Sequence, residues 1–270
     1  MRIQPEICIN EVMETAIATA YRAGLEILKV YDTPFDVEQK EDTSPLTLAD
    51  RNAHEEIAAG LSQTQIPILS EEGRKIPFAE RKEWTRFWMV DPLDGTKEFV
   101  KRNGEFTVNI ALIENGISVA GVIYVPVTGV MYFGIPEKGA FKISKFNNQG
   151  AGLEKWIASA KKLPSSNQSR VYTVVGSRSH KSLETADFMD ELSAEHGEIN
   201  IVSMGSSLKI CLVAEGVADI YPRFAPTMEW DTAAGHAIAK GAGKEIYDHS
   251  TGKPMVYNKE NLLNNWFIVK

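Results

Sequence analysis

An antiparallel sheet is predicted by two apolar runs that meet at Asn115-Gly116. Residues 105–114 and 117–125 are rich in β-branched and other apolar side chains, and Asn-Gly is the dipeptide typical of a tight hairpin turn. Two shorter apolar runs, 130–133 and 140–143, predict further strands of the same sheet. The middle of the chain is therefore predicted to be an antiparallel sheet.

Helices and short strands are predicted on both sides of this sheet. The run 6–30 has apolar residues at helical spacing, and 47–61 predicts a second helix with Thr47 as its N-cap. Short apolar strands are predicted at 66–70 and 87–90, and a surface loop over 161–169. Beyond that loop the pattern alternates, with strands at 171–175, 199–203, 217–221 and 245–247 and helices at 182–196, 206–215 and 232–240.

The change of pattern predicts two halves. Residues 1–155 are expected to form an α+β half that carries most of the candidate metal ligands, and residues 156–270 an α/β half. A chain of 270 residues is long enough for one large domain or for two modest domains that share a cleft.

Charge and composition exclude several classes of protein. The net charge of −7 opposes binding of a nucleic-acid polymer, although metal ions or a few basic groups can still attract a small anion into a cleft. Two cysteines form neither a disulfide framework nor a zinc spacing, and both are expected to be buried free thiols. No apolar run approaches the ~18 residues of a membrane span, and the N-terminus lacks the apolar region of a signal peptide. A cytoplasmic protein is expected.

The motif DPLDGT predicts a site for a metal ion and a phosphate. The apolar run 86–90 brings Asp91 to the end of a buried strand, and Asp94 follows three residues later. Both carboxylates and the Leu93 carbonyl can then offer oxygens to one Mg²⁺. Gly95 permits a sharp turn, and a short helix over 96–99 would present free N–H groups to a phosphate. For this motif alone, an Asx turn without catalytic role is an equal alternative.

Three further acids are candidates. In LSEEG, Glu71 is predicted as a ligand with Glu72 as a supporting charge, because successive side chains at a strand end diverge. In EWDTAAGHA, Asp231 opens a small-residue helix that could pack closely on another backbone; its simpler role is that of an N-cap. Asp50, hydrogen-bonded to Thr96, could deprotonate the attacking water, or could simply stabilise the helix dipole. Considered alone, each of these three acids is better explained by a structural role than by a catalytic one.

Together these motifs resemble the inositol monophosphatase superfamily of Mg²⁺-dependent, Li⁺-sensitive phosphatases. The resemblance rests on SPLTLAD, SEEG, DPLDGTKEF and WDTAAG in this order. The longer text MGSSLKICLVAEGVADIYPRFAPTMEWDTAAGHA is similar to the 3'(2'),5'-bisphosphate nucleotidase branch, and the resemblance covers nearly the whole chain. It implies a layered αβαβα sandwich with the site between its halves.

The resemblance also implies roles for individual residues. Those matching the metal ligands are Glu71, Asp91, Leu93 through its carbonyl, Asp94 and Asp231, for two or three Mg²⁺ per site. Asp50 and Thr96 match the pair that activates water. Gly95 and Thr96 match the phosphate cradle, beside Glu71, Leu93, Asp94 and Asp231. The nucleotide would be held by His180, Ser206, Lys209 and Arg223.

The implied activity is hydrolysis of the 3'-phosphate of adenosine 3',5'-bisphosphate, with 3'-phosphoadenylyl sulfate as a further substrate, in sulfur metabolism. The alternatives are an inositol monophosphatase, a fructose-1,6-bisphosphatase-like enzyme, or a regulatory protein that binds without turnover. The resemblance is compatible with a monomer or a homodimer, and with peripheral association with the cytoplasmic face of the inner membrane, which no basic amphipathic helix here explains.

Overall fold

The structure is a computed structural model. It describes residues 8–31, 33, 45–148, 152–166, 170–176 and 183–270, together with a short strand at 37–39; the strands at 37–39 and 45–47 are described as backbone only. His180 and the side chain of Thr47 lie outside the described part, so their predicted roles stay predictions.

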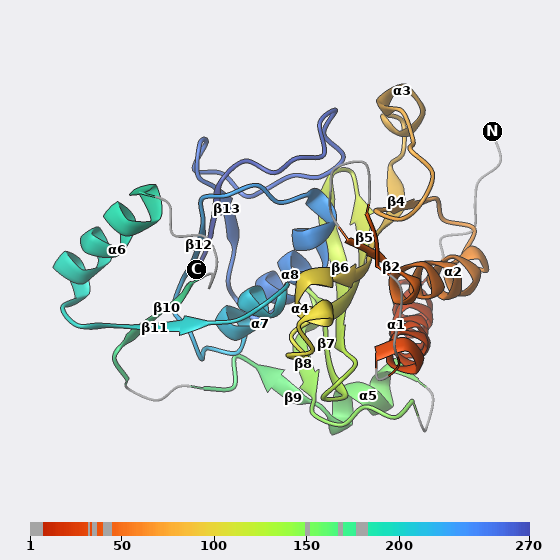
Figure 1. The fold of residues 1–270 in the computed structure, drawn as a ribbon, viewed down its shortest axis with the longest axis horizontal. Helices are drawn as coiled ribbons and strands as arrows, with labels where there is room; N and C mark the ends of the chain where they lie inside the picture. Colours follow the sequence, from red (N-terminus) through yellow and green to blue (C-terminus); the bar gives the residue numbers. More distant parts are fainter. Residues whose placement is uncertain are drawn as a thin grey trace.

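A seven-stranded sheet forms the centre of the molecule (Figure 1). Its strands follow one another in chain order: β3 (Ile68–Ser70), β4 (Arg86–Asp94), β5 (Thr107–Glu114), β6 (Ile117–Val125), β7 (Val130–Ile135), β8 (Gly139–Ile143) and β9 (Lys161–Leu163). Only β3 and β4 run parallel. The β5–β6 hairpin is confirmed, with φ of 50° at Asn115 and 78° at Gly116 as its primed turn requires.

One face of this sheet is covered by the helices α1 (Ile9–Tyr31) and α2 (Leu48–Ser62) (Figure 1). The apolar stripe of α1, including Met13, Ile17 and Ile27, is fully buried against the sheet. The helix α5 (Leu153–Ser159) completes this layer through Leu153 and Trp156. A two-stranded hairpin, β1 (Val37–Gln39) and β2 (Pro45–Thr47), precedes α2.

The opposite face is covered by α7 (Leu208–Ala214) and α8 (Glu229–Gly241). Close packing here depends on small residues, as the sequence predicted. A Cβ atom at Gly121 of β6 would overlap the Ala234 carbonyl of α8, and one at Gly235 would lie 2.8 Å from Ile210 of α7. The helix α8 therefore packs closely on both the large sheet and α7.

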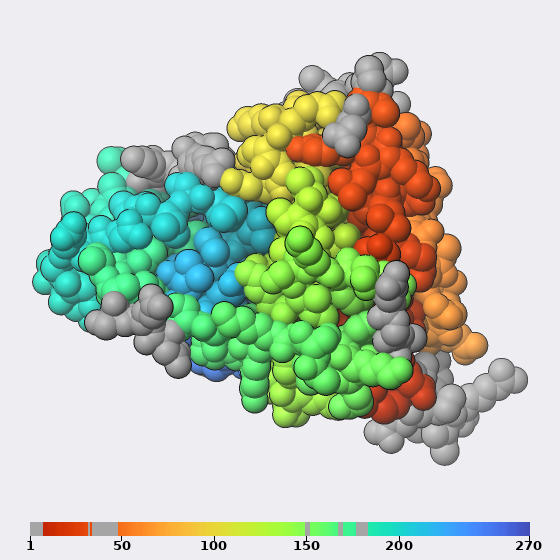
Figure 2. Space-filling model, turned by 90° about the horizontal axis from the view of Figure 1, so that it is seen from below, coloured from red at the N-terminus to blue at the C-terminus, as the bar shows by residue number. Residues whose placement is uncertain are grey.

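The two layers beyond α7 and α8 are built from residues of the second half of the chain. The parallel pair β10 (Tyr172–Gly176) and β11 (Ile199–Ser203) lies near a sheet of order β12 (Tyr221–Arg223), β14 (Phe267–Val269), β13 (Ile246–Asp248). The helix α6 (Leu183–His196) packs outside β10 through Leu192. The layers are thus αβαβα, which confirms the predicted fold class. Figure 2 shows α1 and α2, in red to orange, on the opposite side of the molecule from α6 and β11, in green to cyan.

Several local predictions are wrong. Residues 161–163 are not loop but the edge strand β9, which pairs with β8. The strand expected at 217–221 begins only at Tyr221, because 217–218 continue the turn that ends α7. Cys211 is buried as expected, but Cys8 is exposed. The short helices α3 (Phe78–Arg81) and α4 (Thr96–Val100) complete the elements.

The division into 1–155 and 156–270 stays a prediction; α5 spans this point, and β9 returns to the large sheet. In the described residues, no helix combines the length and apolar character needed to cross a bilayer.

Candidate active site

The DPLDGT turn lies at the end of β4. Asp91 is almost completely buried, and the ladder to β5 is irregular between Asp91 and Asp94. The Leu93 N–H donates to Asp91 Oδ1 at 3.1 Å, so the Asx turn is present. Gly95 adopts φ 95° and ψ 41°, a left-handed conformation that glycine tolerates best. The chain then enters α4 at Thr96, as predicted.

Five acidic residues line one cleft of about 590 Å³, namely Glu98 and the four acids predicted as metal ligands. Asp91 and Asp94 come from β4, Glu71 follows β3, and Asp231 lies in the first turn of α8. Leu93, Gly95 and Thr96 line the same cleft. The structure therefore gathers the predicted metal-ligand residues around one space. Glu72 is not among the lining residues, and its charge acts instead on His54.

Asp231 does not occupy the N-cap position of α8. The N-cap of α8 is Met228, and Asp231 is the third residue of the helix, where its Oδ2 accepts a hydrogen bond from Met228 N at 2.8 Å. This contact closes the first turn and holds one oxygen of the carboxylate. The interpretation of Asp231 as the N-cap is therefore wrong.

Crowding of these acids changes their acidity. Burial raises the pKa of the Asp91 carboxyl well above its usual range, and the charges of Glu71, Asp94, Asp231 and Asp50 raise it further. The pKa of Asp231 is raised in the same way, by burial and then by Asp94 and Glu71. Like charges close together are unfavourable unless a cation neutralises them.

The chemistry of this donor set suits a hard divalent cation, which prefers carboxylate and carbonyl oxygens. As the side chains stand, no group of three or more His, Cys, Asp and Glu residues in the described ranges is close enough to hold a metal ion. Asp94 and Asp231 each have one oxygen occupied by protein hydrogen bonds. Binding of an ion therefore requires small adjustments of side chains that repel one another without it.

Asp50 and Thr96 lie beside this cluster. Asp50 is buried in the first turn of α2, and its charge contributes to the raised pKa of Asp91. Thr96 lines the cleft, and its Oγ1 lies 3.5 Å from the Leu93 carbonyl oxygen. The hydrogen bond between Asp50 and Thr96 stays a prediction.

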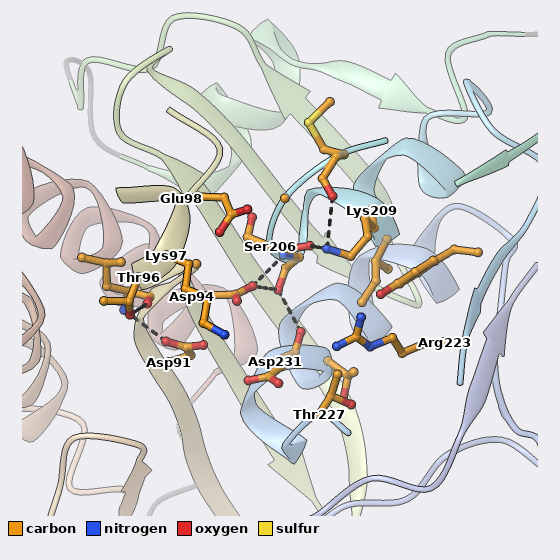
Figure 3. Close-up of a pocket in the computed structure, with 18 of the residues that line it drawn as sticks. Asp91, Asp94, Thr96, Lys97, Glu98, Ser206, Lys209, Arg223, Thr227 and Asp231 are labelled. Atoms are coloured by element: carbon orange, nitrogen blue, oxygen red, sulfur yellow. Dashed lines mark hydrogen bonds between the residues drawn. The ribbon is translucent and has the colours of Figure 1, made fainter. Parts of the chain in front are cut away.

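Basic side chains line the far part of the cleft. Figure 3 shows the carboxylates of Asp91, Asp94 and Asp231 on one side and the side-chain nitrogens of Lys209 and Arg223 on the other. Lys209 Nζ donates to the Ser206 carbonyl at 2.7 Å and lies over the Tyr221 ring. Burial, reinforced by the charge of Arg223, lowers the pKa of Lys209 to about 8. Lys209 is thus partly buried within the cleft.

Other residues of the site were missed by the sequence analysis. Lys97 of α4, Lys101 just after α4 and Thr227 also line the cleft. Ser207, just before α7, and Asn109 of β5 are buried and hydrogen-bond to Asp94. No sequence motif marked Asn109, whereas the doublet Ser206-Ser207 made Ser207 a neighbour of a predicted residue.

Residues 9–266 match the sequence profile of the inositol monophosphatase family.

The chain belongs to the inositol monophosphatase family.

One of the similar proteins is named as a phosphatase of nucleotides. The chain is 46% identical over 263 residues to the 3'(2'),5'-bisphosphate nucleotidase CysQ of Shigella flexneri, covering 96% of this chain and 99% of that protein. The crystal structure of CysQ from Bacteroides thetaiotaomicron superimposes with a TM-score of 0.90 at 50% identity, with 98% of each chain covered. The suhB protein of Bartonella henselae has a TM-score of 0.74 at 25% identity, covering 96% of this chain and 93% of that one.

Family membership agrees with the geometry. Members of the inositol monophosphatase family are generally metal-dependent phosphatases, and the acids gathered in this cleft are the oxygen donors that such chemistry uses. The individual roles assigned to the site residues, including the metal ligands, stay predictions.

Proposed function

We propose that this chain is a Mg²⁺-dependent 3'(2'),5'-bisphosphate nucleotidase that converts adenosine 3',5'-bisphosphate to AMP and phosphate. The observation that carries the proposal is the division of one cleft into an acidic side, with Asp91, Asp94 and Asp231, and a basic side, with Lys209 and Arg223. A substrate with two phosphates fits such a cleft, because one phosphate can lie with metal ions at the acids and the other at the cations.

The acidic side would hold two or three Mg²⁺ through Glu71, Asp91, the Leu93 carbonyl, Asp94 and Asp231. Bound Mg²⁺ would neutralise the scissile phosphate and lower the pKa of the attacking water. Without metal, burial and the neighbouring acids raise the pKa of Asp91 and Asp231 and so favour their protonated forms. Bound Mg²⁺ would stabilise the ionised carboxylates and attract the anionic substrate.

The chain's own groups would then act in the hydrolysis. Thr96 would orient the attacking water, and Asp50 would accept its proton. The water oxygen forms a bond to phosphorus as the bond from phosphorus to the 3'-oxygen breaks, and the 3'-oxygen takes a proton from solvent water and leaves as a hydroxyl. Gly95 and Thr96 would hold the phosphate at the turn, and Ser206, Lys209, Arg223 and His180 would hold the rest of the nucleotide.

The name of the similar Shigella flexneri protein supports the nucleotide as substrate, as does the basic side of the cleft. The runner-up is an enzyme of the same fold that hydrolyses inositol phosphates or fructose 1,6-bisphosphate. A regulatory protein without turnover would not need this full set of acids together with Thr96. Inhibition by Li⁺, a cytoplasmic location and a monomeric or dimeric state remain expectations that follow from the resemblance.

A panel of substrates tests the proposal. Phosphate release would be measured from adenosine 3',5'-bisphosphate, 3'-phosphoadenylyl sulfate, inositol 1-phosphate and fructose 1,6-bisphosphate, each with Mg²⁺ and with a chelator. The bisphosphate nucleotide should have the highest kcat/KM, and no substrate should be hydrolysed without metal. A higher kcat/KM for inositol 1-phosphate would favour the runner-up. No release from any substrate would favour the regulatory protein.

A further inference from the structure

One oxygen of Asp94 is surrounded by donors from other elements. Its Oδ2 accepts hydrogen bonds from Ser207 N at 2.6 Å, from Ser207 Oγ at 2.6 Å and from Asn109 Nδ2 at 3.4 Å. In the described part of the chain, no hydrogen bond reaches Oδ1. The two oxygens of one carboxylate therefore have different environments, and Oδ1 is the one that remains for a ligand in the cleft.

Ser207 provides two of these donors and occupies a junction of four elements. It precedes α7, is almost completely buried, and its Oγ also lies 2.8 Å from the Asp231 carbonyl oxygen of α8. Asn109 of β5 donates to the same Oγ at 2.8 Å. The hydroxyl of Ser207 thus joins β4, β5 and α8 to the start of α7.

The available hydrogens decide which of these bonds form together. A serine hydroxyl has one hydrogen to donate and lone pairs to accept. Asn109 donates to it, so the single hydrogen must go either to the Asp94 carboxylate or to the Asp231 carbonyl. The carboxylate is the closer acceptor and is charged, and hydrogen bonds to charged groups are the stronger ones. Ser207 therefore donates to Asp94 when this acid is ionised.

We infer that Ser207 is a positioning residue for metal binding: together with Asn109, it fixes Asp94 Oδ2 to the protein so that Oδ1 is presented to a divalent cation. The inference rests on the proposed metal dependence of the site. Groups that orient a metal-binding side chain without touching the ion commonly alter metal affinity. Ser207 would act through Asp94, without contacting substrate.

The simpler alternative is that Ser207 only joins the elements together. A second buried serine provides a matched control for this alternative. Ser118 of β6 donates to the Ala233 carbonyl of α8 at 2.7 Å and is equally inaccessible. It therefore ties the large sheet to the same helix as Asp231, but contacts no acid of the cleft.

The test compares Ser207→Ala with Ser118→Ala in the full chain. Each variant loses one buried hydroxyl, so both should unfold at a lower temperature than the wild type. Mg²⁺ affinity would be measured by calorimetric titration without substrate, which separates metal binding from turnover. Ser207→Ala should bind Mg²⁺ ~10- to 100-fold more weakly, whereas Ser118→Ala should bind it like the wild type. At saturating Mg²⁺, the KM of Ser207→Ala for the bisphosphate should be unchanged.

Equal Mg²⁺ affinity for Ser207→Ala, Ser118→Ala and the wild type would overturn the inference alone. A wild type that binds no Mg²⁺ would overturn the proposed function as well. If Ser207→Ala does not fold, Asn109→Ala takes its place, because it removes the other side-chain donor to Oδ2 and leaves the Ser207 N–H. It should also weaken Mg²⁺ binding, and an affinity equal to that of Ser118→Ala would overturn the inference.

Discussion

At the scale of single residues, the site combines groups that would be unfavourable elsewhere. Asp91 is buried beside four other acids, and the partly buried Lys209 lies next to the positive charge of Arg223. The pKa values of Asp91 and Lys209 are shifted, and each shift would be relieved by a ligand of opposite charge. The acids require cations and the basic pair requires an anion, which is the division expected for metal ions and a phosphate ester.

Asp94→Asn tests the acidic side. The substitution keeps the size of the side chain and its Oδ acceptor but removes one negative charge from the predicted metal site. It should lower kcat by orders of magnitude at any Mg²⁺ concentration, with an unchanged circular dichroism spectrum. A folded Asp94→Asn protein with full activity would contradict the assignment of this residue as a ligand.

Lys209→Ala and Arg223→Ala test the basic side. A charge-assisted hydrogen bond to a second phosphate contributes about 1.5–3 kcal/mol, so losing one should reduce kcat/KM for adenosine 3',5'-bisphosphate ~10- to 150-fold. Hydrolysis of inositol 1-phosphate, which lacks that phosphate, should change little. Equal losses on both substrates would mean that these residues support the fold or the metal site instead.

The pH dependence of KM follows from Lys209. Its pKa is lowered to about 8, so this lysine is protonated below that pH and loses its charge as the pH rises through it. KM for the bisphosphate should therefore rise above pH 8, whereas KM for inositol 1-phosphate should not follow this change. In Lys209→Arg the rise should disappear, because a guanidinium keeps its charge. A rise of the same size in the variant would assign it to another group.

At the scale of elements, the start of α8 is held by residues near the end of the chain. Glu229 is completely buried and accepts hydrogen bonds from Asn258 N at 2.6 Å, Lys259 N at 3.0 Å and Lys259 Nζ at 2.5 Å. Arg81 of α3 donates to the carbonyls of Lys259 and Glu260. This network joins α3, which follows Glu71, to the helix turn that carries Asp231.

Lys259→Met tests this network. The variant leaves the buried Glu229 charge with backbone N–H partners only, and should lower the free energy of unfolding by about 1.5–3 kcal/mol. Lys29→Met is the control, since Lys29 pairs with Glu26 on the surface, where an ion pair contributes about 0–1 kcal/mol. Denaturant unfolding of both variants gives the comparison, and equal losses would contradict a special role of the buried pair.

At the scale of the whole molecule, the cleft is assembled from residues far apart in the sequence. Acids of β4 and α8 line the same cleft because α8 packs on the large sheet through Gly121 and Ala234. The Ser207 hydroxyl lies between these two elements. The sequence predicted this packing from the run Ala233-Ala234-Gly235. It also predicted the hairpin, because Asn-Gly specifies its turn locally.

Features that depend on distant partners were not predictable in this way. The strand β9 is a short edge strand with two exposed lysines, and this composition is typical of a loop. Only its pairing with β8 makes it a strand. Ser207 and Asn109 contact Asp94 across many residues of chain, and no local pattern encodes such contacts. Local motifs predicted the acids that line the cleft, whereas the groups that hydrogen-bond to Asp94 are brought to it by the tertiary structure.

The central claim is that one cleft takes a metal-bound phosphate and a second phosphate together. The most direct measurement is kcat/KM of the wild type for adenosine 3',5'-bisphosphate and for 3'-AMP, which differ only in the second phosphate, at saturating Mg²⁺. With one charge-assisted contact of about 1.5–3 kcal/mol, the bisphosphate should be preferred ~10- to 150-fold. Equal kcat/KM values for the two nucleotides would contradict the account, because the basic side of the cleft would then make no contribution to recognition.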